Sequence, residues 1–316
     1  MTRDPVVINC PIIVLVGPTA VGKTALSLRL VQRFDCEIIS MDSMQVYRGM
    51  DIGTAKPSTE EQALVPHHLI DIVDPDDQYD AARFVHDALA AIQDIATRNR
   101  TVLLTGGTGL YLKTLFEGLF TALPTDEGIR MQLRERLEAE GREVLHAELC
   151  RLDPDAGARI HVNDTQRLVR GLEIYRSSGR TWTELIVEQQ KQEQTQKKRF
   201  SRVFQIALDC ERKQLYQRIS RRSQLMLEQG LIEEVERLLS MGYAPYLPSM
   251  QSIGYKHVNK LLSGEWNRDE MLEYLIRDTR RYAKRQMTWF RKHQDLHWFA
   301  RDDERIAARA AEALGL

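Results

Sequence analysis

The most constraining feature of this sequence is a glycine-rich loop that follows a short apolar run near the N-terminus. Residues 12–16 read Ile-Ile-Val-Leu-Val, which is typical of a strand buried on both faces of a parallel sheet. Apolar side chains then recur at helical spacing from residue 22 to residue 34. Residues 17–24 between them match the pattern G-x-x-x-x-G-K-[ST] in the strand, loop and helix context that it requires. The sequence therefore predicts a phosphate-binding loop (P-loop) in a parallel α/β fold.

The residue types of this loop suit an anionic ligand. Glycines let successive N–H groups turn toward one anion, and the N-terminus of the following helix adds partial positive charge. Lys23 brings a full charge, and Thr24 is placed to ligate Mg²⁺, the one metal ion that we expect. The predicted diphosphate-binding residues are Gly17, Pro18, Thr19, Ala20, Val21, Gly22, Lys23 and Thr24.

Strands alternate with helices along much of the chain, which predicts a P-loop NTPase-like parallel sheet flanked by helices. Further strands are expected at 37–40, 68–73, 101–105, 203–208 and 296–299. Helices are expected at 81–99, 211–228, 231–241, 256–262 and 268–293, with a closing helix from Asp303.

A mainly helical insert domain interrupts this pattern. Residues 126–197 carry no convincing strand, and short amphipathic helices are expected at 129–140, 144–152, 164–177 and 181–188. Because the strand pattern returns at 203–208, we predict that residues 1–124 and 198–316 form the α/β core and that 125–197 form the insert. A length of 316 residues accommodates one large domain or two modest ones.

Two more segments reach the edge of the sheet where the P-loop lies. Ligands of open α/β sheets bind beyond the carboxyl ends of the strands, and Asp42 lies two residues past the strand at 37–40. Asp42 is placed to act as a base, and an aspartate here would equally well cap a helix that begins at Ser43. The glycine cluster at 106–111 follows the strand at 101–105 and would reach the same edge.

A P-loop alone does not name a reaction, because kinases, ATPases and GTPases all use one. The sequence has no N-K-x-D motif of the GTPase type. Further distinctive blocks follow the P-loop in order at 42–47, 50–57, 106–111, 164–173, 251–256 and 284–291. Together with the P-loop, these blocks resemble the tRNA dimethylallyltransferase (tRNA isopentenyltransferase) family of bacterial type, from about residue 12 to residue 299.

The resemblance implies transfer of a dimethylallyl group from dimethylallyl diphosphate to N6 of adenosine 37, next to the anticodon, in tRNAs that read codons beginning with U. Diphosphate is released. The adenine amino group is a poor nucleophile, so a carboxylate must accept its proton, and Asp42 is the candidate general base. By resemblance, Thr108 lies near the reacting base and Arg222 contacts the diphosphate. Thr108 is equally well explained as a helix N-cap.

The resemblance also implies that the insert contacts the anticodon stem-loop. The residues expected to bind tRNA are Asp42, Ser43, Met44, Gln45, Thr108, Arg130, Gln166, Arg167, Leu168, Val169, Arg170, Gln251, Ser252, Ile253, Gly254, Tyr255, Lys256, Lys284, Arg285, Gln286, Met287, Thr288, Trp289, Phe290 and Arg291.

The charge pattern agrees with an RNA substrate only locally. The chain has 44 Lys and Arg against 45 Asp and Glu, so its net charge gives no reason to expect nucleic-acid binding. Residues 197–222 nevertheless contain nine Lys and Arg against two Asp and Glu, and residues 277–293 contain seven against one. Each run alone would be a solvated helix face, whereas the two together favour contact with a phosphate backbone.

No apolar stretch approaches the ~20 residues needed to cross a bilayer, so we expect a soluble, cytoplasmic protein. We also expect it to act as a monomer. The four cysteines are too far apart for a C-x-x-C pair, which suggests neither a zinc site nor a disulfide framework. Buried free thiols are the expected alternative.

Three other functions fit part of the pattern. A small-molecule kinase would explain the P-loop and Asp42 but gives no role to the blocks at 166–170, 251–256 and 284–291. A non-catalytic RNA-binding P-loop switch would fit the basic runs and would not need Asp42. An adenylate isopentenyltransferase acting on a free nucleotide would not need a helical insert.

Overall fold

The computed structural model of the chain describes residues 8–118, 126–195 and 200–316. Their contacts divide them into two compact units. The helical unit comprises the described residues of 117–197, and the α/β unit comprises those of 6–116 and 198–316. Both predicted domain boundaries, 124/125 and 197/198, lie outside the described residues, so that assignment stays a prediction.

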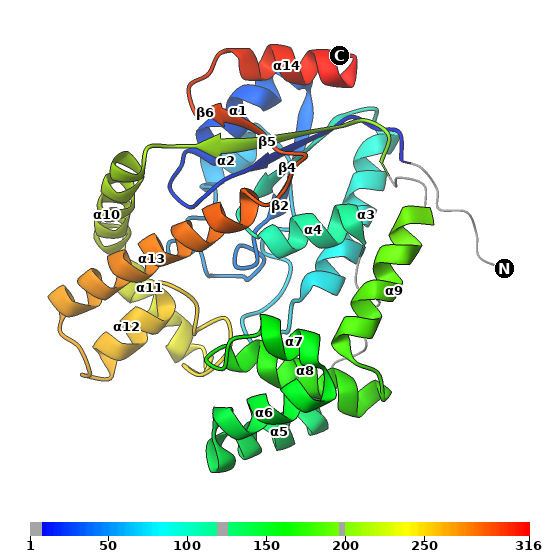
Figure 1. Ribbon diagram of the computed structural model, residues 1–316. Helices are drawn as coiled ribbons and strands as arrows, with labels where there is room; N and C mark the ends of the chain where they lie inside the picture. Colours follow the sequence, from blue (N-terminus) through cyan, green and yellow to red (C-terminus); the bar gives the residue numbers. More distant parts are fainter. Residues whose placement is uncertain (1–7, 119–125, 196–199) are drawn as a thin grey trace. The chain divides into compact units, whose positions relative to one another are not determined.

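The α/β unit is built on one parallel sheet of six strands in the order β3-β2-β4-β1-β5-β6 (Figure 1). The strands are β1 (Ile12–Val16), β2 (Cys36–Met41), β3 (His67–His68), β4 (Thr101–Gly106), β5 (Val203–Asp209) and β6 (His297–Ala300). Every residue of β1 and β2 is buried, as expected for strands covered by helices on both faces. The predicted fold class is confirmed.

The strand predicted at 68–73 is wrong beyond its first residue. Leu69 and Asp71 have φ angles of 62° and 54°, left-handed values that interrupt an extended chain. The N–H groups of residues 71–73 donate instead to the carbonyls of residues 45 and 46. This segment therefore supports the loop that follows β2 and does not extend the sheet.

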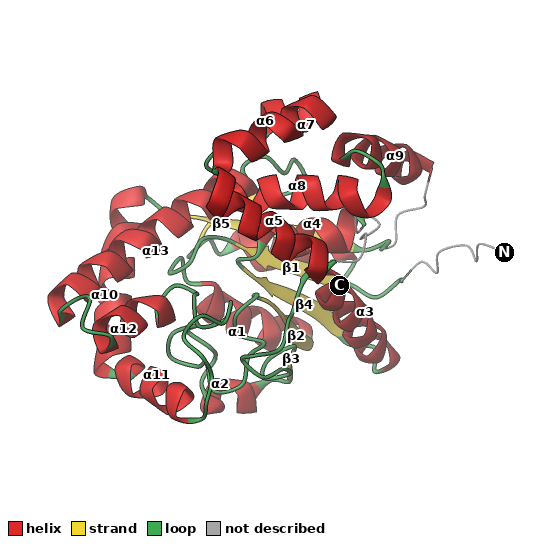
Figure 2. Ribbon diagram, turned by 90° about the horizontal axis from the view of Figure 1, so that it is seen from below, coloured by secondary structure: helices red, strands yellow, loops and turns green. Residues whose placement is uncertain are grey.

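Helices pack on both faces of the sheet. The helices of this unit are α1 (Lys23–Phe34), α2 (Thr59–Leu64), α3 (Ala81–Thr97), α4 (Gly109–Glu117), α10 (Arg212–Glu228), α11 (Leu231–Ser240), α12 (Tyr255–Leu262), α13 (Arg268–Phe290) and α14 (Arg305–Leu314). In Figure 1, α1 and α14 cover one face and α3 covers the other. Figure 2 shows the loops that follow the strands gathered on the side where α10 to α13 lie. The ligand-binding edge of the sheet is therefore surrounded by helices from the C-terminal part of the chain.

The helical unit consists of short amphipathic helices around their own apolar core. They are α5 (Glu127–Glu140), α6 (Arg142–Leu152), α7 (Pro154–Arg159), α8 (Thr165–Ser178) and α9 (Trp182–Thr195). Leu133, Leu145 and Leu168 are fully buried between them. The aspartates before α5, α7 and α8 accept hydrogen bonds from N–H groups of the first turn, which explains where these helices start. Helix α7, like α2, was missed by sequence analysis because six residues are too few to show a helical repeat.

Two other expectations concern the described residues as a whole. Across residues 8–118, 126–195 and 200–316, no helix is long and apolar enough to cross a membrane. Cys10 and Cys36 are buried free thiols as predicted, whereas Cys150 and Cys210 are half-buried.

Candidate active site

The P-loop connects β1 to α1, as the motif predicts. Ala20 and Gly22 adopt left-handed φ angles of 65° and 108°, which fold the loop tightly. No side chain caps α1 in the described structure, so the first N–H groups of this helix are available to an anion. Lys23 Nζ donates to the carbonyl oxygens of Gly17 at 3.0 Å and Pro18 at 3.1 Å. The lysine amine therefore lies against the loop where an anion would bind.

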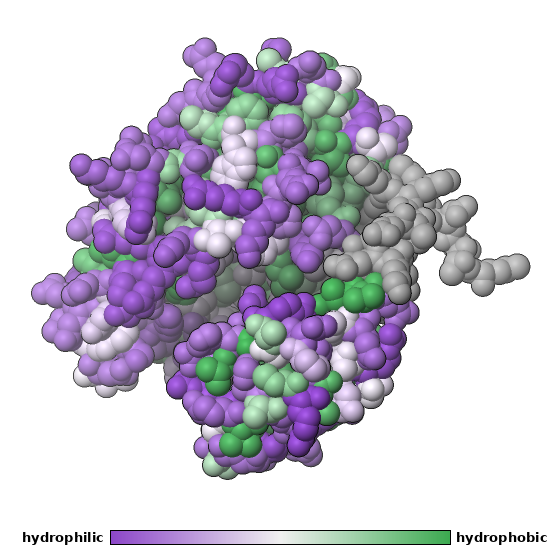
Figure 3. All heavy atoms as spheres, in the orientation of Figure 1, coloured by the Kyte–Doolittle hydropathy of each residue, from purple (hydrophilic) through white to green (hydrophobic). Residues whose placement is uncertain are grey.

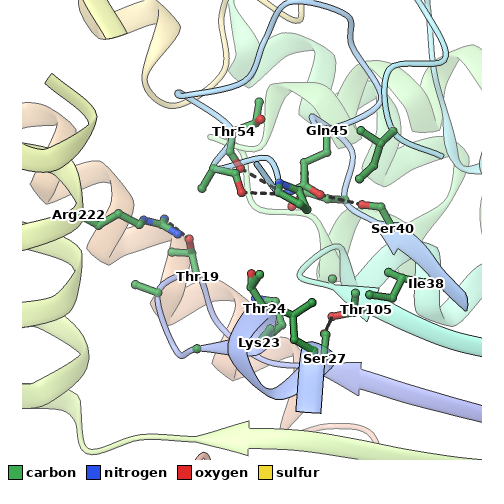
Figure 4. Close-up of a pocket in the computed structure, with 18 of the residues that line it drawn as sticks. Thr19, Lys23, Thr24, Ser27, Ile38, Ser40, Gln45, Thr54, Thr105 and Arg222 are labelled. Atoms are coloured by element: carbon green, nitrogen blue, oxygen red, sulfur yellow. Dashed lines mark hydrogen bonds between the residues drawn. The ribbon is translucent and has the colours of Figure 1, made fainter. Parts of the chain in front are cut away.

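Two arginines one turn apart on α10 also reach the P-loop. Arg222 donates to Thr19 Oγ1 (Figure 4). Arg218 donates to the carbonyl oxygen of Val21 at 3.1 Å. The structure thus brings the arginine that the resemblance singled out to the phosphate-binding loop. It also brings Arg218, the other arginine on this face of α10, to the same loop.

These residues form one end of a cavity of about 410 Å³ within the α/β unit. In Figure 4, Lys23 and Thr24 lie on one side of the cavity, and Gln45 and Thr54 lie on the other. Its apolar lining includes Leu28, Ile38, Ala55, Pro57 and Ile70. The cavity therefore combines a cationic end with enough apolar wall for a small hydrocarbon group.

Asp42 lines the same cavity directly after β2. Its Oδ1 accepts a hydrogen bond from the N–H of Met44 at 2.9 Å, which makes an Asx turn. No helix begins at Ser43, so the capping role considered for Asp42 is excluded. No hydrogen bond joins Oδ2 to the described residues, which leaves this oxygen available to a ligand.

Thr108 binds the segment that carries Asp42. Its backbone carbonyl accepts from the N–H groups of Tyr111 and Leu112 at the start of α4, as an N-cap does. Its hydroxyl, however, accepts from the N–H of Ser43 at 3.1 Å. The side chain therefore does not cap its own helix but fixes the residue next to Asp42.

The glycine cluster after β4 allows this close approach. The N–H of Thr108 donates to the carbonyl of Met41 at 3.3 Å. A side chain at Gly106 would meet that same carbonyl oxygen at 2.0 Å. Only glycine lets the two strand ends lie this close, so the second glycine block serves the same site as the P-loop.

Gln45 is held in the cavity by hydrogen bonds at both ends of its amide. Its Oε1 accepts from Ser40 Oγ at 2.9 Å, and its Nε2 donates to the carbonyl of Ala55 at 3.2 Å and, more weakly, to that of Thr54 at 3.5 Å (Figure 4). The amide orientation is therefore fixed before any ligand binds.

The electrostatics of the cavity favour an incoming anion. Burial is the largest cause that lowers the pKa of Lys23 to about 8, and nearby Arg222 lowers it further, while the Asp42 carboxylate acts in the opposite direction. Burial also lowers the pKa of Arg222. Burial thus disfavours the charged forms of both side chains when no ligand is bound. The negative charge of a bound diphosphate would offset this cost.

Some residues of the block at 284–291 pack against the two glycine loops, and others lie on the surface. Gln286 accepts from the N–H of Thr19 at 2.9 Å and donates to the carbonyl of Gly107 at 2.9 Å, so it joins the two glycine loops. Trp289 is half-buried and packs against Gly109, and Phe290 is fully buried. The exposed members of the block are Lys284, Arg285, Thr288 and Arg291.

These exposed residues belong to a hydrophilic face. In Figure 3 the surface over α13 is mostly purple. Together with half-buried Met287, residues Lys284, Thr288 and Arg291 line a second cavity of about 750 Å³.

The basic run at 197–222 is not such an exposed face. Residues 197–199 lie outside the described residues, and Arg218 and Arg222 face the P-loop. It therefore does not form one continuous surface patch.

The block at 251–256 is only partly accessible. Gln251 is exposed, and Ser252, Ile253 and Lys256 are half-buried, with Lys256 Nζ 3.2 Å from an oxygen of Asp278. Gly254 is buried, and Tyr255 has no exposed surface.

The tRNA-binding residues expected in the helical unit lie on α5 and α8. Arg130, Gln166, Val169 and Arg170 line a cavity of about 320 Å³, and Arg167 is exposed beside Asp164. Fully buried Glu173 forms ion pairs with Arg130 at 3.2 Å and Arg170 at 3.0 Å. These two arginines therefore hold the unit together as well as line the cavity.

Three of the expected RNA contacts need correction. The side chains of Leu168, Tyr255 and Phe290 are fully buried. A side chain with no exposed surface cannot touch a macromolecular ligand, so these residues support the site by packing.

The residues present fit a Mg²⁺ ion only if its other ligands come from substrate and water. Within the described residues, no group of three or more His, Cys, Asp or Glu side chains could hold a metal ion. Thr24, however, is exposed at the cavity. Mg²⁺ commonly keeps several waters and binds through few protein ligands and substrate phosphates, which agrees with this single hydroxyl.

Comparison with known proteins gives the family. Residues 45–293 match the family model described as IPP transferase. The chain is 52% identical to the tRNA dimethylallyltransferase of Desulfotalea psychrophila, over 94% of this chain and 93% of that protein. The chain belongs to the tRNA dimethylallyltransferase (IPP transferase) family. The tRNA dimethylallyltransferase of Thermotoga maritima is 45% identical over 90% of each protein.

Solved structures agree with membership of the tRNA dimethylallyltransferase family. The tRNA isopentenylpyrophosphate transferase of Bacillus halodurans is 40% identical, with a TM-score of 0.67 over 96% of this chain and 94% of that one. A eukaryotic dimethylallyltransferase acting on tRNA is 30% identical, with a TM-score of 0.75 over 96% of this chain and 78% of that one.

Sequence analysis of this family member missed part of the cavity wall. Ser40, Thr54, Ala55 and Pro57 line the cavity and had no assigned role. The block at 50–57 contributed to the resemblance, but nothing in its composition indicates that its backbone carbonyls hold Gln45.

Proposed function

We propose that this chain is a tRNA dimethylallyltransferase, which transfers a dimethylallyl group from dimethylallyl diphosphate to N6 of adenosine 37 in tRNAs that read codons beginning with U. Family membership supports the reaction class. The observation that carries the proposal is one cavity lined by the cations Lys23 and Arg222 and by Asp42, one of whose carboxylate oxygens has no hydrogen-bond partner among the described residues.

The diphosphate binds at the cationic end. The loop N–H groups, Lys23 and Arg222 neutralise the charge that develops on the diphosphate as the bond between C1 of the dimethylallyl group and its oxygen breaks. Both electrons of that bond leave with the diphosphate. The apolar side chains of the cavity, such as Leu28 and Ile38, receive the hydrocarbon. Mg²⁺, held by the Thr24 hydroxyl, would supply further positive charge to the phosphate oxygens.

Asp42 accepts the proton of the nucleophile. The N6 lone pair of adenine forms the new C–N bond, and the proton passes to the free oxygen of Asp42. The Asx turn to Met44 and the contact from Thr108 to Ser43 keep this carboxylate in place. Gln45 and Ser43 beside it are suited to hydrogen-bond the extruded base.

The RNA contacts are assigned to exposed polar residues. Near the end of α13 these are Lys284, Arg285 and the C-cap residue Arg291, and in the helical unit they are Gln166 and Arg167. Basic side chains contact the phosphate backbone, which is the main source of RNA affinity. We propose that the enzyme acts in the cytoplasm, where its tRNA substrate is, and as a monomer.

The test is a transfer assay. Purified protein is incubated with Mg²⁺, labelled dimethylallyl diphosphate and unmodified tRNA that reads codons beginning with U, and the RNA is then digested and examined for prenylated adenosine. We expect label beside the anticodon, and none without Mg²⁺ or with a tRNA that has guanosine at position 37. ATP consumption without labelled RNA would favour the kinase or switch functions. Labelling of free adenosine monophosphate in preference to tRNA would favour the free-nucleotide enzyme.

A further inference from the structure

A buried carboxylate outside the P-loop cavity accepts hydrogen bonds from the segment that leads into one wall of that cavity. Glu234 lies on α11 with only 1% of its surface exposed, on the same face as Leu231, Val235 and Leu238. A buried carboxylate is costly unless its oxygens are satisfied. No salt bridge joins it to a cation in the described structure, so its hydrogen bonds must compensate its charge.

Four donors converge on this carboxylate. Its Oε2 accepts from the N–H of Asp51 at 3.1 Å and of Ile52 at 2.8 Å. Its Oε1 accepts from the N–H of Gly53 at 3.1 Å and from the hydroxyl of Tyr255 at 2.6 Å. Burial, and then the negative charge of Glu234, raise the pKa of Tyr255, so its hydroxyl keeps the proton that it donates. Glu234 therefore fixes three successive peptide units that form no part of a helix or strand.

Glu234 and Tyr255 together form a clamp on residues 51–53, because the Tyr255 ring also packs against this segment. A side chain at Gly53 would meet the Tyr255 ring at 2.4 Å, so the ring lies directly against this glycine. Tyr255 itself has no exposed surface. Residues 51–53 are thus held on one side by hydrogen bonds and on another by an aromatic ring.

The clamped segment leads directly to the cavity wall. Just after it, the N–H of Ala55 donates to the carbonyl of Ile52 at 3.0 Å, and Thr54 Oγ1 donates to the carbonyl of Met50 at 2.7 Å. The carbonyls of Thr54 and Ala55 then accept from Gln45 Nε2, whose amide lines the cavity (Figure 4). A continuous chain of bonds therefore runs from Glu234 to Gln45.

We propose that Glu234 is a positioning residue for the transferase reaction: by holding residues 51–53 it sets the Thr54 and Ala55 carbonyls that orient the Gln45 amide in the cavity. This inference rests on the proposed function. It concerns the wall that carries Gln45 and Thr54 and not the P-loop. It therefore predicts an effect on turnover without an effect on diphosphate binding.

The test compares Glu234→Gln with Glu236→Gln, an exposed residue on the same helix. The amide of glutamine keeps the size of the side chain but turns an N–H₂ group toward backbone N–H donors. We expect kcat to fall by about 10- to 100-fold, as misplacement of a positioning group does. The KM for dimethylallyl diphosphate and the affinity for inorganic pyrophosphate should change less than about twofold. Glu236→Gln should match the wild type.

Coupling to Gln45 separates positioning from a general structural role. In a Gln45→Ala background, Glu234→Gln should cost little further activity, because its effect acts through Gln45. Fully additive losses, an unchanged kcat, or a parallel loss of pyrophosphate affinity would each overturn the proposal. If Glu234→Gln does not fold, Tyr255→Phe removes one of the four bonds, and a smaller loss of kcat with unchanged pyrophosphate affinity is then expected. An unaltered kcat in Tyr255→Phe would in that case count against the proposal.

Hydrogen exchange gives a readout that does not depend on activity. Amides of residues 51–53 should be protected in the wild type and exchange faster in Glu234→Gln but not in Glu236→Gln. If the wild type transfers no prenyl group, the proposed function fails, while the exchange result still decides whether Glu234 holds this segment. Equal protection in all three proteins would overturn the clamp itself.

Discussion

The hydroxyl of Thr108 accepts a hydrogen bond from the backbone N–H of Ser43 at 3.1 Å, so the glycine loop after β4 is bonded to the residue next to Asp42. Two strand ends that are far apart in sequence therefore hold the proposed base between them. The position of Asp42 depends on Thr108 as well as on its own Asx turn.

Replacing Thr108 tests this dependence. Thr108→Val keeps the shape of the side chain but removes the acceptor, and we expect kcat to fall by about 10- to 100-fold. Pyrophosphate affinity, measured by calorimetry, should be unchanged because none of the hydrogen bonds of Thr108 in the described structure reaches the P-loop. Thr108→Ser restores the hydroxyl and should recover most of the activity. Failure of serine to rescue would mean that the methyl group, and not the hydrogen bond, is what matters.

Asp42→Asn isolates the carboxylate's charge from its structural role. An asparagine side-chain oxygen can still accept from the N–H of Met44, so the turn is preserved. Loss of the base should lower kcat by about 10²- to 10⁴-fold, with the Kd for tRNA nearly unchanged. Single-turnover assays at saturating tRNA measure the step directly. Wild-type turnover in Asp42→Asn would exclude Asp42 as the base.

The affinity for pyrophosphate should depend on pH through Lys23. Its pKa in the free protein is lowered to about 8, and a bound anion favours the protonated amine, so binding above pH 8 must take up a proton. We expect the Kd for inorganic pyrophosphate, divided by that of Lys23→Arg at the same pH to cancel the ionisation of pyrophosphate itself, to rise about tenfold for each pH unit above 8 and to level off below it. Titration calorimetry between pH 7 and 9.5 checks this. Lys23→Arg, which stays charged, should have a flatter profile.

A surface arginine of the helical unit tests the RNA contacts. Charge reversal at both Arg167 and Arg170 would confound binding with stability, because Arg170 is paired with buried Glu173. Arg167→Glu alone is preferable, since 69% of its side chain is exposed. We expect a higher KM for tRNA, a weaker salt dependence of binding and unchanged pyrophosphate affinity. Arg142→Glu, an exposed position on α6, is the control. An effect of Arg167→Glu on pyrophosphate binding alone would contradict the assignment.

The stability of the α/β unit should depend on Glu37, a buried carboxylate on β2. Its pKa is lowered to about 2, first by the hydrogen bonds from Arg98 and also by His68. The stabilisation is present above the ordinary value of 4.5 and is lost as the pH falls from there toward 2. Glu37→Gln should cost about 2 kcal/mol at pH 7 in urea unfolding and remove this acid sensitivity. Asp94→Asn breaks an exposed pair with the same Arg98 and should cost less than about 0.5 kcal/mol.

Much of the site could be predicted where the signal is local. The P-loop is one continuous block between an apolar strand and an amphipathic helix, and Asp42 follows from the rule that ligands bind beyond the strand ends. The prediction of a strand at 68–73 was wrong because the left-handed conformations of Leu69 and Asp71 cannot be recognised from the pattern of apolar residues.

Other features depend on contacts between distant segments. The carbonyls of Thr54 and Ala55 act as backbone groups, so no residue type identifies them. Glu234 did leave a signal, since it is an acid on the apolar face of α11, but its partners at 51–53 are visible only in the fold. Tyr255 was assigned to RNA because its block is distinctive, whereas its burial shows that it packs against Gly53.

The pairing of β1 bears on how the chain folds as it is synthesised. Ile12 pairs with Val102 on one side and with Val203 on the other, so the helical unit is encoded between the two neighbours of the first strand. While the ribosome is still translating that unit, β1 and β4 can associate, but the other edge of β1 has no partner. An unpaired strand edge of aliphatic residues invites association with other chains. The helical unit, whose core is local in sequence, has time to fold during this interval, and completion of the catalytic sheet must wait for β5 to emerge.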